Sequence, residues 1–131
     1  MRFLQPPGWA APRGYSNGVA TRGEMIFVAG QVGWNGDEVF EHAGFVEQAE
    51  QALRNIVAVL SEAGAEPRHL VRLTWFIADV QEYAESLAPL GDAYRRVVGS
   101  HFPAMSVIEV NGFIEDGARL EIEATAVVPD R

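Results

Sequence analysis

The sequence predicts an α+β fold in which two helices cover one face of a mixed β-sheet. Three observations carry this prediction. Two segments repeat apolar residues at helical spacing, several short segments are apolar or alternate apolar with polar residues as strands do, and turn residues separate these segments. The order is β-β-α-β-α-β-β, two similar halves of strand, helix and strand without an internal sequence repeat. We expect one domain, residues 1–131.

The first part of the chain predicts a hairpin after an irregular start. Residues 1–14 are rich in proline and glycine, which favours an irregular lead-in over a strand. Tyr15 to Val19 and Glu24 to Val32 predict two short strands joined by a turn at residues 21–23. A loop follows, with Trp34 at its tip.

The two helices follow from apolar residues that recur with a period of 3.6. In the first, from Phe45 to Gly64, Gly64 is placed to end the helix, and the apolar face consists of Phe45, Ala49, Ala52, Leu53, Ile56, Val57, Leu60 and Ala63. The second covers residues 81–98. Pro89 is tolerated only in a first turn, so we expect a turn before Ser86 and the main helix to begin near Leu87 to Pro89.

The remaining segments predict three strands. Leu70 to Ala78 is almost continuously apolar, which favours a central strand covered on both faces. Phe102 to Val110 and Ala118 to Val128 are separated by the turn dipeptides Asn111-Gly112 and Asp116-Gly117, so we expect them to be neighbours in the sheet. Alternation in the last strand sends one set of residues to the core and the opposite set outward: Arg119, Glu121, Glu123 and Thr125.

Composition excludes several classes of function. The net charge of −8 disfavours a phosphate-binding surface, and we expect no nucleic-acid partner. The chain has no cysteine, so it forms no disulfide, thiolate metal site or cysteine nucleophile. No apolar run has the length of a signal peptide or a membrane span, so we expect a cytoplasmic protein without a membrane partner.

Other catalytic or metal-binding patterns are missing from the sequence. The three histidines are widely spaced and predict no metal site, and Ser106 has no histidine near it in the sequence. The chain also lacks the glycine-rich motifs of nucleotide enzymes.

Several motifs together resemble a known family. Phe102-Pro103-Ala104-x-Ser106 and Leu120-Glu121-Ile122-Glu123-Ala124-x-Ala126 are similar to the C-terminal signature of the Rid family, the YjgF-like reactive intermediate deaminases. Residues 27–32 resemble the family's N-terminal strand, and residues 45–64 resemble its first helix. The resemblance covers nearly the whole chain in the right order. It implies a chorismate-mutase-like fold and a homotrimer, in which three sheets close into a barrel with ligand clefts between subunits.

The resemblance also implies candidate site residues. Glu121 matches a glutamate that positions the attacking water, so it is the candidate catalytic residue; the alternative is a solvated or salt-bridged strand face. Tyr15 matches a tyrosine that reaches the cleft, unless it is only an edge-strand aromatic. Gly30 matches the glycine whose backbone borders the ligand. Trp34 provides an aromatic wall or else an exposed anchor at the loop tip.

The candidate cleft lacks the family's anion anchor. Met105 stands where the family has an arginine that binds the substrate carboxylate through a bidentate fork. Methionine either fills the cleft as adaptable packing, which we favour, or makes a selective apolar contact with a different ligand. Ala29, Ala88 and Val107 replace further polar groups, and backbone groups near Val107 remain available to orient a substrate. The pocket is therefore expected to be more apolar than that of a typical imine deaminase.

Two functions remain open at this point. The first is a Rid-like deaminase that hydrolyses a small imine or enamine without a cofactor, its specificity altered by Met105. The second is a non-catalytic trimer that binds a small, fairly apolar molecule. The missing arginine favours the second function, and the retained Glu121 favours the first. A ribonuclease activity, which some relatives' names suggest, is disfavoured by the acidic charge.

Overall fold

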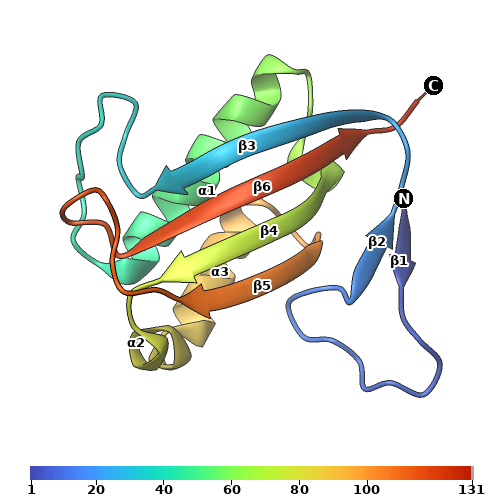
Figure 1. Ribbon diagram of the computed structural model, residues 1–131, viewed down its shortest axis with the longest axis horizontal. Helices are drawn as coiled ribbons and strands as arrows, with labels where there is room; N and C mark the ends of the chain where they lie inside the picture. Colours follow the sequence, from blue (N-terminus) through green and yellow to red (C-terminus); the bar gives the residue numbers. More distant parts are fainter. Residues whose placement is uncertain (131) are drawn as a thin grey trace.

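The computed structural model describes residues 1–130, and its central feature is a four-stranded mixed sheet with helices on one face (Figure 1). The strand order is β3-β6-β4-β5. Strands β4 and β5 run parallel, and the other neighbours run antiparallel. The strand bounds are Glu24–Val32 for β3, Leu70–Ile77 for β4, Ala104–Glu109 for β5 and Leu120–Val128 for β6. The predicted α+β class, with its mixed sheet and two long helices, is confirmed.

Two long helices bury their apolar faces against the sheet. Helix α1 (Phe45–Glu62) ends as predicted, because Gly64 adopts a φ of 69° that side chains disfavour. Helix α3 (Leu87–Val97) begins within the predicted range of Leu87 to Pro89, so this proline lies in the first turn, where it is tolerated. The core contains Leu53, Ile56 and Leu60 of α1, Leu73 and Ile77 of β4, and Leu120, Ile122 and Ala126 of β6. None of the helices in the described residues is long and apolar enough to cross a membrane.

Two short helical segments occupy the connections around β4. The 3-10 helix η1 (Pro67–His69) begins with a capping box between Glu66 and His69. Helix α2 (Val80–Glu85) begins at Asp79, whose carboxylate accepts hydrogen bonds from the backbone N–H groups of the second and third residues that follow it. Both segments shorten the path between β4 and the helices beside it.

The prediction that the last two strands are neighbours is wrong. Strand β4 lies between β5 and β6, pairing with β5 in parallel and with β6 in antiparallel. The turn dipeptides at 111–117 do lie between the two strands in the chain, but β4 lies between these strands in the sheet. The crossover through α2 and α3 decides this order, because it returns the chain parallel to β4.

The predicted N-terminal hairpin is also wrong. Residues 1–14 are not wholly irregular, because β1 (Arg2–Leu4) pairs with β2 (Gly18–Ala20) in a separate two-stranded sheet. Strand β3 pairs only with β6. The residues between β1 and β2 form a long loop beside the β5 edge of the main sheet (Figure 1).

The helix-free face of the sheet, which we call the open face, is only partly covered. Strand β4 is central as predicted, but Arg72 on its open side is exposed, so helices cover only one of its faces. Phe27 of β3 is 71% exposed there, beside its cross-strand partner Thr125. Arg119 does not share this face with Glu121, because its Nε donates to Glu82 Oε1 of α2 at 3.2 Å. The open face is thus mixed in polarity and unpartnered within one chain.

A buried glutamine fixes the loops at one end of the sheet. Gln48 of α1 is 1% exposed, and its Nε2 donates to the carbonyls of His42 and Gly117, both at 2.9 Å. Its Oε1 accepts from the backbone N–H of Arg119 at 2.8 Å. One side chain therefore holds the loop before α1 and the loop before β6 in place.

Candidate functional site

A cavity of about 320 Å³ lies between the β5 edge of the sheet and helices α2 and α3. Strands β4 and β5 supply one wall of the cavity, and helices α2 and α3 supply the second. The N-terminal loop supplies part of the mouth. Its lining consists of Arg13, Gly14, Trp75, Tyr83, Leu87, Leu90, Gly91, Tyr94, Arg95, Phe102, Met105 and Val107. This size suits a small molecule.

Strand pairing aims two of the predicted residues into this cavity. Met105 pairs with Leu73 and Val107 pairs with Trp75, so all four side chains share the helix-facing side of the sheet. Met105 also packs against the hydrophobic core, which agrees with its predicted role as packing. Backbone alternation alone thus brings residues 105 and 107 to one wall.

The N-terminal loop is held against the start of β5. The backbone N–H of Ser16 donates to the carbonyl of Pro103 at 3.0 Å, and its hydroxyl donates to the carbonyl of Phe102. These bonds place Arg13 and Gly14 at the cavity mouth. Tyr15 lies between the lining residues and this anchor, 41% exposed, but it does not itself line the cavity.

The polar groups of the cavity are cationic or neutral. Its lining contains two arginines and no carboxylate. Burial raises the pKa of Tyr83 and, more strongly, that of Tyr94, so both phenols are neutral at pH 7. Tyr94 Oη also donates to the carbonyl of His101 at 2.6 Å. None of the residues that line the cavity therefore supplies a negative charge to balance the two arginines.

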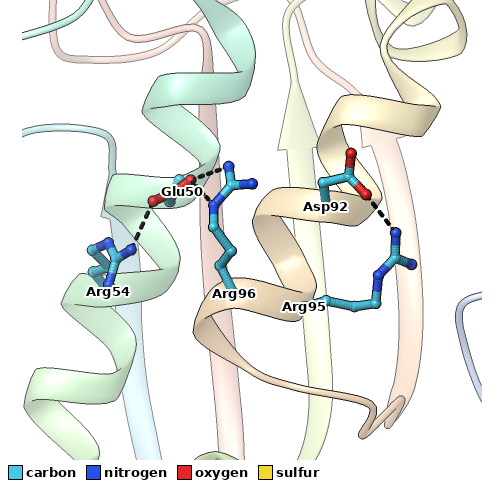
Figure 2. Close-up of polar contacts among 5 residues, drawn as sticks. All are labelled: Glu50, Arg54, Asp92, Arg95 and Arg96. Carbon is cyan, nitrogen blue, oxygen red and sulfur yellow. Dashed lines mark hydrogen bonds and ion pairs between the residues drawn. The ribbon is translucent and has the colours of Figure 1, made fainter.

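The two adjacent arginines of α3 have different partners. Arg96 donates to Glu50 Oε1 of α1 at 2.6 Å, and Glu50 also accepts from Arg54 (Figure 2). The hydrogen bonds from these arginines lower the pKa of Glu50, so this bridge between the helices stays charged near neutral pH. Arg95 extends from another side of α3, where Asp92 accepts from it at 2.7 Å. Only Arg95 reaches the cavity.

Glu121 and Gly30 lie together, but on the open face. A Cβ atom at Gly30 would collide with the Glu121 carboxylate, so this carboxylate occupies the space that glycine leaves. Glu121 pairs with Phe76, whereas the adjacent residue Trp75 lines the cavity. Within one chain, the candidate catalytic carboxylate is therefore on the opposite side of the sheet from Met105.

Trp34 lies apart from both groups. It sits in the loop after β3, where its ring contacts Phe40 at a centroid distance of 5.6 Å. Its carbonyl accepts from Asn55 Nδ2 of α1 at 2.8 Å. Trp34 is half-buried and contributes nothing to the cavity lining, so in one chain it is a loop anchor.

Sequence reasoning missed most of the helical side of the cavity, including Arg95, and also Arg13 of the N-terminal loop. No motif in the sequence singles out Arg95, and Arg13 lies in the segment predicted to be irregular. The available signal was helical spacing, because Leu87, Gly91 and Arg95 recur every four residues and so share one face of α3. Trp75 is another cavity residue that the sequence did not identify. Its Nε1 is the one buried side-chain polar atom in residues 1–130 without a hydrogen-bond partner.

Comparison with known proteins gives consistent matches over the chain. The family model described as Endoribonuclease L-PSP matches residues 8–128. A goat protein named 2-iminobutanoate/2-iminopropanoate deaminase is 34% identical, covering 78% of this chain and 72% of its own. A RutC family protein of Aquifex aeolicus is 33% identical over 97% of this chain and 99% of its own. The crystal structure of YyfB of Yersinia pestis, titled a conserved Rid family protein of unknown function, superimposes with a TM-score of 0.86 at 30% identity, covering 97% and 98% of the chains.

Proposed function

The chain belongs to the Rid (YjgF-like) family, and on this premise we propose that it is a deaminase that hydrolyses a small imine or enamine. Water adds to the carbon of the C=N bond, a proton moves to nitrogen, and the C–N bond breaks. One imine and one water thus give one carbonyl compound and one ammonia. An enamine reaches the same path after a proton shift to its imine form.

The observation that carries this proposal is the carboxylate of Glu121 lying over Gly30. A carboxylate can hold the attacking water and take its proton as it adds to the imine carbon. Gly30 leaves the room that this carboxylate occupies. The deaminase named among the relatives has a 2-imino acid as its substrate, which supports hydrolysis of C=N as the reaction class.

The proposal includes a homotrimer, because one chain separates the carboxylate from the cavity. Strands β3 and β5 are the two edges of the main sheet. If three sheets close into a barrel, β3 of one copy lies beside β5 of the next, which brings Gly30 and Glu121 of one copy towards the cavity of another. Phe27 on the open face would then be covered. Sedimentation should give three times the chain mass of 14.3 kDa, and a monomer mass would contradict the assembly.

A non-catalytic binding protein is the second candidate. The observation that favours it is Met105, which has none of the donors with which an arginine binds a carboxylate. The cavity lining that one chain supplies does not include Glu121, so a protein that only binds its ligand would not need this carboxylate. A binding protein would retain small molecules in this cavity without turnover.

One assay separates the two candidates. Hydrolysis of 2-iminopropanoate, generated in situ by an amino-acid oxidase, is measured for the wild type, Met105→Arg and Glu121→Gln. For a deaminase of 2-imino acids the wild type accelerates the reaction, and Glu121→Gln loses about a hundredfold or more in rate while it retains ligand affinity. Activity only in Met105→Arg would mean that the natural substrate is an imine of another class. Ligand binding without turnover in any of the three would support the binding protein.

A further inference from the structure

We propose that Arg95 of α3, assisted by Arg13 of the N-terminal loop, is the anion-binding group of the cavity, and that its ligand is a small carboxylate with a branched or aromatic apolar body. This inference deepens the proposed function and rests on it for the location of the site. It assigns the charge-binding role to the helix and the loop, whereas Met105 on β5 provides apolar contact only.

The charge of the cavity is the first argument. The whole chain has a net charge of −8, yet the lining that one chain supplies to this cavity carries two guanidinium groups and no carboxylate. Tyr83 and Tyr94 add no negative charge, because burial keeps both phenols protonated. Two cations at the mouth of a partly dry cavity attract an anion more strongly than the same pair on an open surface. The charge of the ligand is therefore negative.

The geometry of Arg95 is the second argument. Its guanidinium lies over Gly91, one turn earlier on α3, where a Cβ atom would come within 3.5 Å of Nη1. Only Nη2 is engaged, by Asp92 Oδ1 at 2.7 Å, in a pair whose side chains are both more than half exposed. Such a pair is weak and exchanges readily. In the described part of the chain, no hydrogen bond engages Nε or Nη1 of Arg95, so a planar anion has donors available to it.

The apolar walls of the cavity indicate the chemistry of the part of the ligand that does not carry the charge. Apart from the arginines, the tyrosines and Gly14 and Gly91, the walls are the side chains of Trp75, Leu87, Leu90, Phe102, Met105 and Val107. They offer aromatic and aliphatic surface and only sparse polar contacts. Burial of an apolar group there gains free energy in proportion to the area removed from water. A ligand with its anion at the mouth and a bulky apolar end inside satisfies both regions at once.

The test uses a stable matched pair of probes, 3-phenylpropanoate and its neutral counterpart 3-phenylpropanamide. Binding of each is measured by isothermal titration calorimetry on the full-length protein in its native assembly. We expect the carboxylate to bind about tenfold or more tightly than the amide, since hydrogen bonds to a charged acceptor exceed those to a neutral one. Arg95→Gln should remove this difference, and Arg13→Gln should reduce it. The matched control is Arg96→Gln, on the same helix but directed to Glu50, and it should leave both affinities unchanged.

The outcomes distinguish this inference from the proposed function, because the probes do not react. Loss of the carboxylate preference in Arg95→Gln supports the inference even if no imine is hydrolysed. Equal affinity for both probes, an equal loss of both in Arg95→Gln, or no binding of either probe at millimolar concentration would overturn it. Failure to turn over any imine, with charge-selective binding intact, would overturn only the deaminase.

Discussion

The two sides of the sheet differ in what a single chain completes. On the helix-facing side, β4, β5 and α3 enclose a cavity with apolar walls and cations at its mouth. On the open face, Glu121 lies over Gly30 with no helix above it, and Phe27 of the same face is exposed. One side is therefore formed to hold a molecule, and the other presents a carboxylate that requires a neighbour to become part of a closed site.

This difference shows that binding and hydrolysis depend on separate parts of the fold. Trp75 and Phe76 are consecutive residues of β4, yet the first contacts the cavity and the second pairs with Glu121. Because side chains alternate along a strand, a change on one side can leave the other unchanged. The following predictions test whether the two sides are as independent as the structure indicates.

The largest expected effect comes from releasing the loop that leads into β6. Gln48→Leu keeps the size of the side chain but leaves the carbonyls of His42 and Gly117 and the N–H of Arg119 without their buried partner. We expect a loss of about 3 kcal/mol in the free energy of unfolding, measured by urea denaturation. The control is Gln51→Leu, whose amide bonds only to Asn55, and it should lose less than 1 kcal/mol, a rough allowance for one half-exposed hydrogen bond. Equal losses in the two variants would contradict the role assigned to Gln48.

A smaller and more selective effect is expected from filling the space at Gly30. In Gly30→Ala the new Cβ displaces the Glu121 carboxylate, and a misplacement of about 1 Å can cost about a hundredfold in rate. Binding of 3-phenylpropanoate should be largely retained, because neither Gly30 nor Glu121 belongs to the cavity lining that one chain supplies. Gly36→Ala is the matched control, since no atom lies near its added Cβ. Parallel losses of turnover and binding in Gly30→Ala would show that the two sides are not independent.

The smallest effect concerns acid sensitivity at His69, in the 3-10 helix that precedes β4. Burial, followed by the charge of Arg68, lowers the pKa of His69, while Glu66 opposes the shift and His101 adds to it. The folded protein therefore favours neutral His69. Its contribution to stability is complete above the unfolded pKa of about 6.5 and is lost as the pH falls from there through the lower folded pKa.

Thermal unfolding at several pH values checks this sign. The melting temperature should fall by a few degrees between pH 7.5 and 5.5, and His69→Asn, which keeps an acceptor for the N–H of Glu66, should fall less. His42→Asn alters an exposed histidine and should follow the wild type. A slope in His69→Asn as steep as that of the wild type would assign the acid sensitivity to other groups.

The sequence predicted the helices better than the sheet, for a physical reason. Helix α1 and the start of α3 depend on residues close together in the chain, such as Gly64 and Pro89, so local spacing is sufficient. The pairing of β5 with β4, and of β1 with β2, depends on which distant segments meet. Turn residues at 111–117 show where a strand stops, but they do not determine which strand lies beside it.

The candidate site was predictable in part, for the residues of β5 but not for the arginine of α3. The family resemblance identified residues 105 and 107, and the alternation of β5 places them on one wall. Arg95 and Arg96 are adjacent in the sequence, and no motif distinguishes one from the other. On a helix, however, neighbours point about 100° apart, so one reaches the cavity and the other reaches Glu50. Only the packing of α3 against the sheet determines which arginine belongs to the site.

The position of Glu121 and Met105 on opposite sides of one sheet also bears on how such a protein can diverge. Residue 105 can change from a charged to an apolar side chain without a collision or an unpaired charge beside Glu121, because β4 and its backbone hydrogen bonds stand between them. Ligand preference can therefore drift by substitutions around the cavity while the Glu121–Gly30 pair is inherited intact.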